Sequence, residues 1–361
     1  MAAAALTLIW NVVRGKFLTV PYPEEDCSGK TIIVTGANSG KILTLPSPLS
    51  IRHIYSCFKD VQRRSFLLTA HPGLGREACR HFVRLGAAKV ILACRNLDKG
   101  EEAKKDIEGT TQKQGVVDVW QLDLASFDSV REFAARVNKL DRVDVLINNA
   151  SFLTFRREMV EGHESTLTVN VISTYLLTLL VLPALRRTSS QCNITPHIVV
   201  VSSEAAFLSP LPERDSDSIF KALDAKADVM ERYNISKLLQ LMIVPRLAED
   251  LDASRKGRIV VTGLHPGFCG TELFRQLPFP LSLIYKVFSM AISRTAEMGS
   301  RTLLAAAFAK EDLHGKFMAD AELHDFPKIM QGEEGAKLVR RVWDELMGML
   351  EGIESGSTSN I

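Results

Sequence analysis

The chain has 361 residues, of which 46% are hydrophobic and 24% are charged, and its formal net charge is +2. This composition is typical of a globular protein with a full core, and the length suffices for one large α/β domain or two small ones. So small a net charge gives no argument for nucleic-acid binding. The basic excess belongs to residues 41–72, where Asp60 is the one acid among Lys41, Arg52, Lys59, Arg63 and Arg64.

Residues 2–13 form an apolar run that is followed by Arg14 and Lys16. The run is shorter than the roughly 20 residues that a membrane-spanning helix needs. Two interpretations remain, a helix on a membrane surface and a helix that caps the fold. The six cysteines show no C-x-x-C pair and no metal-ligand spacing. We therefore expect reduced thiols, no bound metal and a cytoplasmic protein, with peripheral membrane contact as the alternative.

Short β-branched runs alternate with longer helical patterns, which predicts βαβ units and a parallel sheet. The runs are almost continuously apolar, as strands covered on both faces should be. The predicted strands are 30–35, 89–94, 116–122, 143–147, 197–202, 258–263 and 315–319. The predicted helices are 74–86, 98–108, 127–139, 157–187, 220–250 and 295–310. The apolar stretch 171–185 is interpreted as a buried helix or a homodimer face, and the tail after Gly352 is predicted to be disordered.

The chemistry-bearing residues follow the predicted strands. The first strand runs into a glycine-rich turn, Gly36-Ala37-Asn38-Ser39-Gly40, which lets backbone N–H groups approach a pyrophosphate at a helix N-terminus. Asn148-Asn149-Ala150 ends the fourth strand, Asn170 lies within a helical pattern, and Ser203 ends the fifth strand.

Tyr233 and Lys237 are separated by one helical turn and therefore share a helix face. A lysine cation in that position favours ionisation of the phenol, whose ordinary pKa is about 10. Such a tyrosine exchanges a proton with an alcohol or a carbonyl near neutral pH.

In this chain order the motifs closely resemble the short-chain dehydrogenase/reductase family over roughly residues 28–320, apart from one segment. The resemblance implies a single Rossmann-type, doubly wound α/β domain. Its seven-stranded parallel sheet has the order 3-2-1-4-5-6-7, with helices on both faces. Residues 1–27 are then an N-terminal apolar helix and extension, and residues 321–361 a C-terminal helix and disordered tail.

The resemblance implies a role for each catalytic residue. Tyr233 is the general acid/base, and Ser203 holds the substrate oxygen and stabilises its developing charge. Ser203 is chosen over Ser202 because the family ordinarily uses the second serine. Lys237 lowers the pKa of Tyr233 and binds the nicotinamide ribose, and Asn170 holds a proton-relay water.

A nicotinamide dinucleotide is the implied cofactor. Arg95 follows the second strand where an NAD enzyme of the family usually has an acid, and an arginine pairs with a 2′-phosphate, so NADP is predicted. Thr271 is the implied donor to the nicotinamide amide, and Asp123 is the acid beside the adenine. The predicted cofactor-binding residues are Gly36, Asn38, Ser39, Gly40, Leu74, Gly75, Arg95, Asp123, Asn149, Tyr233, Lys237, Pro266, Gly267 and Thr271.

Two departures from the family pattern bear on the substrate. Ser151 stands where the family has glycine after N-N-A, which would crowd the adenosine side. The interval from Ser203 to Tyr233 is longer than usual, as in the retinol-dehydrogenase-like branch and its fungal relatives. A lipophilic alcohol or carbonyl, in lipid or secondary metabolism, is the expected substrate. Residues 278–292 are interpreted either as an apolar lid or as ordinary core.

The segment 41–73 interrupts the cofactor motif, which resumes at Leu74 as though uninterrupted. A genuine insertion is one interpretation, because loop closure costs only about 0.6 kcal/mol per doubling of length. We favour a retained intron, because Gly40-Lys41 and Pro72-Gly73 admit codons with donor-like and acceptor-like sequences. A flexible detour here is expected to separate the last glycine from the first turn.

The sequence therefore predicts an NADP-dependent oxidoreductase that acts on a small lipophilic alcohol or carbonyl. Two alternatives remain. A sugar-nucleotide epimerase normally has G-x-x-G-x-x-G at the first turn, whereas Gly36, Gly40 and Gly75 restore G-x-x-x-G-x-G when the segment is removed. A catalytically impaired binding protein would follow from the interrupted cofactor loop.

Overall fold

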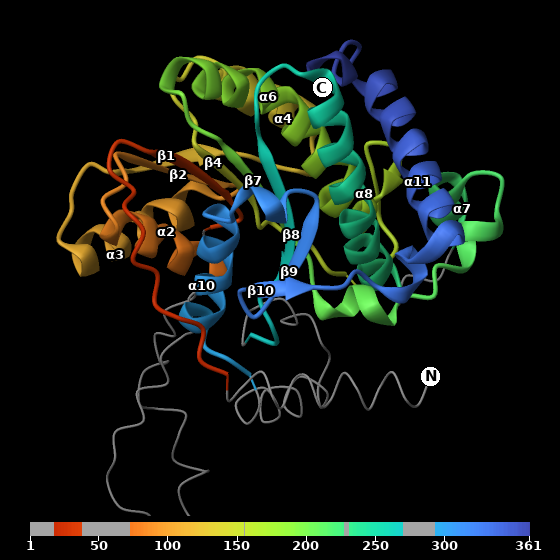
Figure 1. The fold of residues 1–361 in the computed structure, drawn as a ribbon, viewed down its shortest axis with the longest axis horizontal. Coiled ribbons are helices and arrows are strands. Elements are labelled where there is room, and N and C mark those ends of the chain that lie inside the picture. The colour runs from red at the N-terminus through yellow and green to blue at the C-terminus, as the bar shows by residue number, and fades with distance from the viewer. Residues whose placement is uncertain (1–17, 38–72, 155, 227–230, 270–292) are drawn as a thin grey trace, which may run out of the picture.

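The computed structural model describes residues 18–37, 73–154, 156–226, 231–269 and 293–361. A sheet runs through the centre of this part of the chain, with helices on both faces (Figure 1). Its order is β10-β9-β8-β7-β4-β1-β2-β3. The strands are β1 Thr31–Thr35, β2 Lys89–Cys94, β3 Val117–Gln121, β4 Val145–Asn148, β7 His197–Val201, β8 Val260–His265, β9 Lys316–Ala319 and β10 Glu322–His324.

Seven of these strands pair in parallel, in the order predicted for the Rossmann-type sheet. The eighth, β10, was not predicted. It pairs antiparallel with β9 through a tight turn at Asp320 and Ala321, both of which have positive φ angles, as hairpin turns require. All three residues of β10 are exposed, and the strand lacks the continuous apolar run of the buried strands. The sheet thus has eight strands rather than seven and extends past residue 320.

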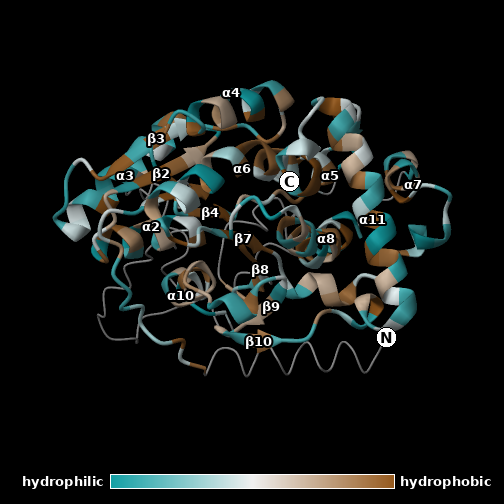
Figure 2. Ribbon diagram, turned by 45° about the horizontal axis from the view of Figure 1, so that its top comes forward, coloured by the Kyte–Doolittle hydropathy of each residue, from teal (hydrophilic) through white to brown (hydrophobic). Residues whose placement is uncertain are grey.

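Alternate residues of the strands enter two separate cores. Ile33 and Leu146 face one core, which α4 Phe127–Val137, α6 Ser173–Cys192, α8 Arg232–Ser254 and α11 Gly332–Ile353 cover. Ile32 and Ile147 face the other, under α2 Leu74–Arg84, α3 Leu97–Thr111 and α10 Ala296–Ala307. Figure 2 shows hydrophobic residues concentrated around the sheet and hydrophilic residues on the outer sides of the helices. This two-sided burial explains why the strands read as continuous apolar runs.

The predicted helix 157–187 begins differently in the structure. A small hairpin, β5 Met159–Val160 and β6 His163–Glu164, precedes it. Glu161 and Gly162 turn this hairpin with positive φ angles, which glycine adopts at no steric cost. The helix then runs through α5 Ser165–Leu167, the π turn η3 Thr168–Ile172 and α6. The predicted helix 220–250 is likewise divided, into α7 Ile219–Ala225 and α8.

The helical stretch Ser165–Cys192 is the one described helix with the length and hydropathy of a membrane span, yet 83% of its apolar window is buried inside the fold. It packs in the core beside α4, as a buried helix. The apolar run 2–13, most of the segment 41–73 and the stretch 278–292 lie outside the described residues.

The prediction of a disordered C-terminal tail is wrong. After α11 the chain forms the 3-10 turn η9 Thr358–Asn360, and Ser357 is buried with its hydroxyl bonded to the carbonyl oxygen of Leu350. Arg186 on α6 donates to the main-chain oxygen of Asn360. A short polar segment rich in serine predicts disorder from its composition. The partners that order this tail lie elsewhere in the chain, so the sequence of the tail does not reveal them.

Candidate active site

The predicted catalytic residues meet at the carboxyl ends of the central strands, where open α/β sheets bind their ligands. Ser203 follows β7, and Tyr233 and Lys237 lie one turn apart near the start of α8. Asn170 lies in η3, which packs against α8. The structure therefore brings Asn170, Ser203 and the Tyr233–Lys237 pair to this edge from three separate parts of the sequence.

Lys237 is almost fully buried on the side of α8 that faces β7. Its Nζ donates to the main-chain oxygen of Val201 at 2.9 Å and to Oε1 of Gln240 at 2.9 Å. The same nitrogen lies 5.8 Å from the centre of the Tyr233 ring. Burial lowers the pKa of Lys237 to about 7, so its cation depends on the few acceptors around it.

The two serines after β7 have different partners. The Ser202 hydroxyl donates to the main-chain oxygen of Lys237 at 2.8 Å and is buried, so it joins β7 to α8. The Ser203 hydroxyl accepts from the Ala205 N–H at 3.2 Å, as the cap of η4 Glu204–Leu208, and is half-buried. This arrangement agrees with the choice of Ser203 as the serine that faces the substrate.

Asn170 is fully buried, and its side chain has structural partners. Oδ1 accepts from the Phe152 N–H at 2.8 Å, and Nδ2 donates to the Phe152 carbonyl at 2.9 Å and to the Ser236 hydroxyl at 3.0 Å. The main-chain oxygen of Asn170 accepts from Nε2 of Gln240 at 2.6 Å. The Asn170 side chain thus fixes the loop that follows Ala150. Its main-chain oxygen instead contacts Gln240, the neighbour of Lys237.

Gln240 was not predicted, although the sequence carries a signal for it. It lies three residues after Lys237, so the two side chains share a helix face. A glutamine is compatible with a helix at any position, however, and its tertiary partner, the main-chain oxygen of Asn170, becomes visible only in the structure.

The glycines of the first turn fit a dinucleotide. Gly36 has a φ of +69°, and a Cβ there would lie 2.7 Å from the Cα of Ala150. A Cβ at Gly75 would lie 2.6 Å from Nδ2 of Asn149 and 3.1 Å from the Cα of Ala37. Gly73 caps α2, and no side chain in the described part of the chain caps this helix N-terminus, the kind of position that binds anions.

The expectation that the segment 41–73 separates the last glycine from the first turn is wrong. Gly75 lies against Ala37 and Asn149, although the chain between them is long. Asn149 itself donates through Nδ2 to the Thr35 carbonyl at 2.8 Å, which joins β4 to β1. Packing of α2 against β1 and β2 is sufficient to hold the glycine in place. Asn38, Ser39 and Gly40 lie outside the described residues.

The remaining cofactor positions lie along the same edge. Arg95 follows β2, is exposed, and forms no ion pair within the described part of the chain. Asp123 follows β3 and accepts from the Ala125 N–H at 3.0 Å, a local turn that fixes its carboxylate. Leu74 begins α2 and is half-buried beneath Gly299 of α10.

Pro266 and Gly267 follow β8, and Thr271 lies outside the described residues. Gly267 has a φ of +76°, and its N–H donates to Nδ1 of His265 at 3.1 Å. A Cβ at Gly267 would lie 2.8 Å from the Arg294 guanidinium, which pairs with Asp320 at 2.5 Å. The turn that would meet a nicotinamide is thus held between β8 and the β9–β10 hairpin.

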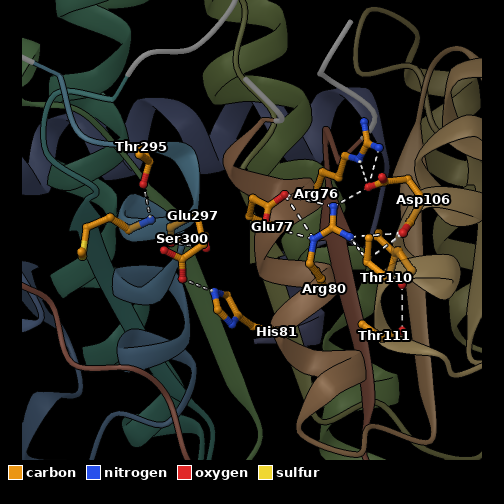
Figure 3. A network of polar contacts seen from close by, with 12 residues as sticks. Arg76, Glu77, Arg80, His81, Asp106, Thr110, Thr111, Thr295, Glu297 and Ser300 are labelled. Carbon is orange, nitrogen blue, oxygen red and sulfur yellow. Dashed lines mark hydrogen bonds and ion pairs between the residues drawn. The ribbon is translucent and has the colours of Figure 1, made fainter. Parts of the chain in front are cut away.

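A polar network that the sequence did not reveal supports the start of α2 (Figure 3). Arg76, directly after Gly75, is buried and pairs with Asp106 of α3 at 2.5 Å. Arg80 pairs with the same carboxylate and with Glu77. Both arginines lower the pKa of Asp106 against the opposing effect of its partial burial. The network fixes α2 against α3 beside the glycine turn.

A second unpredicted pair lies beside Ser203. His265 accepts from Gly267 through Nδ1, so its proton is on Nε2, 3.9 Å from Oε1 of Glu204. Burial lowers the pKa of His265 to about 4 and, with repulsion from Asp320, raises the pKa of Glu204 to about 7. At neutral pH the His265 ring is therefore uncharged and the Glu204 carboxyl group is only partly ionised.

Comparisons with known proteins agree with this geometry. A family model described as "short chain dehydrogenase" matches residues 66–213. Short chain dehydrogenase/reductase dmxR8 of Cryptosporiopsis sp. is 38% identical over 352 residues, covering 95% of this chain and 97% of that protein. Short chain dehydrogenase atnD of Emericella nidulans is 39% identical over 325 residues, covering 89% and 93%.

Solved structures share the fold. An uncharacterized protein from Mycobacterium paratuberculosis aligns with a TM-score of 0.59 at 24% identity, over 90% of this chain and 95% of its own. NADPH-bound carbonyl reductase from chicken fatty liver aligns with a TM-score of 0.53 at 19% identity, over 82% and 99%.

The sheet order, the site at its carboxyl edge and the extended similarity to dmxR8 and atnD lead to one conclusion. The chain belongs to the short-chain dehydrogenase/reductase family and is an oxidoreductase with a Rossmann-type fold.

Proposed function

We propose that the protein is an NADP-dependent oxidoreductase that interconverts a lipophilic alcohol and its carbonyl compound, with Tyr233 as acid/base. The observation that carries the proposal is the buried Lys237 ammonium site, 5.8 Å from the Tyr233 ring. A cation there stabilises a tyrosinate, and a tyrosine so tuned transfers a proton near neutral pH.

Each side chain has a defined part in the proposed reaction. In reduction, the Tyr233 hydroxyl would give its proton to the substrate oxygen, while a nicotinamide held at the site would supply the hydride to the carbonyl carbon. The Ser203 hydroxyl donates to the same oxygen as charge develops on it. Lys237 would hold the nicotinamide ribose and would favour the tyrosinate that remains. In oxidation, Tyr233 takes the proton of the alcohol.

The preference for NADP rests on Arg95. This side chain is exposed directly after β2, where no acid stands to bind the ribose hydroxyls of NAD. An exposed guanidinium suits a 2′-phosphate, which it binds through charge-assisted hydrogen bonds. A protein described as an NAD(P)-dependent gluconate 5-dehydrogenase from Beutenbergia cavernae has the same fold and contains NADP.

The lipophilic substrate class is supported by the surface after Ser203. Phe207 and Leu208 of η4 are 42% and 39% exposed, although both are large hydrophobic residues. Phe207 lies edge-on to His265, next to the proposed catalytic serine. The relatives dmxR8 and atnD come from fungi, and a step of fungal secondary metabolism fits such a substrate. The narrower assignment to a retinol-dehydrogenase-like branch has no support from these relatives.

The test is a screen of the purified 361-residue chain. NADPH or NADH is mixed with a panel of aromatic, long-chain aliphatic and hydroxy-acid carbonyl compounds, and loss of the reduced cofactor is followed by absorbance. We expect turnover of lipophilic ketones or aldehydes with NADPH. Turnover restricted to small polar acids, or a preference for NADH, would contradict the proposal.

A further inference from the structure

A buried glutamine lies behind the proposed catalytic residues. Gln240 has no exposed surface, and its amide joins two members of the site. Oε1 accepts from Nζ of Lys237 at 2.9 Å, and Nε2 donates to the main-chain oxygen of Asn170 at 2.6 Å. The main-chain oxygen of Gln240 accepts the Tyr175 hydroxyl at 2.6 Å, which fixes the residue independently of its side chain.

The chemistry of the two partners demands an amide. An ammonium group only donates hydrogen bonds, and a main-chain carbonyl only accepts them. A primary amide satisfies both at once, and in only one orientation, with its oxygen toward Lys237. A carboxylate would face the Asn170 carbonyl with a second acceptor, and a thioether of similar size would satisfy neither partner.

Lys237 depends on this contact because its ammonium group is buried and has few acceptors among the described residues. Its two resolved acceptors are Gln240 and the carbonyl of Val201, and burial alone accounts for its lowered pKa. From α8 itself, Tyr233 is the titratable group that faces it. Of the elements packed on α8, η4 carries Glu204 and β8 carries His265, and these two side chains lie 3.9 Å from each other. No described carboxylate pairs with Lys237.

We propose that Gln240 is a positioning residue of the reaction, whose amide holds Lys237 as a cation beside Tyr233 and links it directly to Asn170. The amide thereby occupies the connection that the family resemblance assigns to a water molecule. This inference rests on the proposed function of Tyr233 and Lys237. It assigns Gln240 no contact with substrate or cofactor.

The test measures the ionisation of Tyr233 without needing the natural substrate. The chain has five tyrosines, and an ultraviolet difference titration of the wild type against Tyr233→Phe, both with NADP⁺, isolates Tyr233. In the wild type we expect its pKa below the ordinary value of about 10. In Gln240→Met we expect it to rise by about one unit or more, because fewer Lys237 side chains stay charged.

Tyr175→Phe is the matched control. It removes a hydrogen bond to the main chain of the same glutamine and leaves the amide in place. We expect a lower melting temperature and an unchanged pKa of Tyr233. An unchanged pKa in Gln240→Met, accompanied only by lower stability, would show that Gln240 merely fills the core and would overturn the inference.

Gln240→Asn covers the case in which Gln240→Met fails to fold. Its amide is one methylene shorter, so it reaches one of the two partners, and we expect a smaller upward shift of the pKa. No shift in this variant would also overturn the inference. If instead wild-type Tyr233 titrates near its ordinary value, the proposed function of the Tyr233–Lys237 pair fails first.

Discussion

Gly75 and Asn149 touch so closely that a single added methyl group at Gly75 would lie 2.6 Å from the Asn149 amide nitrogen. The contact joins the start of α2 to the end of β4, on the edge where the cofactor phosphates would lie. Asn149 is itself tied to Thr35, so it has little freedom to move away.

We therefore expect Gly75→Ala to weaken NADPH binding by about tenfold or more, because overpacking at a fixed site typically costs about 1–3 kcal/mol. Fluorescence titration of NADPH measures the loss. Gly348→Ala is the matched control, since a Cβ at that helical position meets nothing within 4 Å. It should bind NADPH normally and unfold at the same or a slightly higher temperature. Equal affinity in Gly75→Ala and Gly348→Ala would contradict the proposed phosphate site.

Deletion of residues 41–73 is expected to improve the enzyme. Gly75 already lies in place in the full chain, so the benefit should come from joining Gly40 directly to Leu74 and shortening the phosphate turn. Restoring one charge-assisted hydrogen bond is worth about 1.5–3 kcal/mol, which corresponds to about a tenfold or greater gain in NADPH affinity. Both lengths are expressed and titrated side by side. Identical affinity and turnover would identify the segment as a tolerated surface loop.

Tyr233→Phe should lower kcat by about 10²-fold or more, in line with the contribution of a positioned general acid. The substitution removes one oxygen and leaves the hydrogen bonds of Lys237 to Val201 and Gln240 in place. NADPH affinity should change little, which separates loss of chemistry from loss of binding. Single-turnover absorbance with a ketone found in the screen gives the rate. Retention of near-normal turnover would remove Tyr233 from the mechanism.

Arg95→Ala is expected to weaken NADPH binding by about tenfold or more and to leave NADH binding nearly unchanged, because hydrogen bonds to charged groups are worth about 1.5–3 kcal/mol. Arg340→Ala, at another exposed arginine on α11, controls for a general loss of positive charge. Added salt should reduce the difference between wild type and Arg95→Ala. A parallel loss of affinity for both cofactors would show that Arg95 does not read the 2′-phosphate.

The carboxyl group of Glu204 should make stability depend on pH. Its pKa is about 7 in the folded protein against 4.5 as the ordinary value, and its side chain is 15% exposed. The folded state therefore holds a proton that the unfolded state releases, so this stabilisation is present below pH 4.5 and is lost as the pH rises to about 7.

Glu204→Gln removes that dependence. Relative to wild type, we expect the variant to gain up to about 3 kcal/mol in unfolding free energy between acidic and neutral pH, with no further gain above. Urea unfolding at several pH values measures the difference, and it cancels the opposite contribution of His265, whose lowered pKa both proteins share. If the difference in unfolding free energy between wild type and Glu204→Gln did not change with pH, the pKa of Glu204 would not be raised in the folded protein.

The sequence was sufficient for the parallel sheet because strands such as β1 and β7 are buried on both faces and show uninterrupted apolar runs. The sequence also predicted that the residues after these strands lie close together, because the carboxyl ends of parallel strands meet at one edge of the sheet. It was insufficient for β10, whose three residues are exposed, and for the C-terminal tail, whose polar groups find partners such as Arg186.

Tertiary contacts also explain what was missed within the site. Gln240 is recognised as part of the site by its hydrogen bond to Asn170, which lies on another helix. Glu204 is recognised by its proximity to His265 on a neighbouring strand. A glutamine three residues after a lysine, or a glutamate after a serine, is common in any helix or loop. Only the contacts between elements distinguish these residues from any other polar residue in a helix or loop.

Because of the π turn at Thr168–Ile172, the direction of the Asn170 side chain depends on the number of residues in that turn. Each residue advances a helix by about 100°, so the wider turn changes which way Asn170 faces relative to α6. In this register Asn170 reaches Phe152, while Thr178 still accepts from Asn148. Loss of a single residue from the turn would leave every other side chain unchanged. It would nevertheless turn either Asn170 or Thr178 away from its hydrogen-bond partner. Insertions and deletions, rather than substitutions, are therefore the changes this helix should tolerate least.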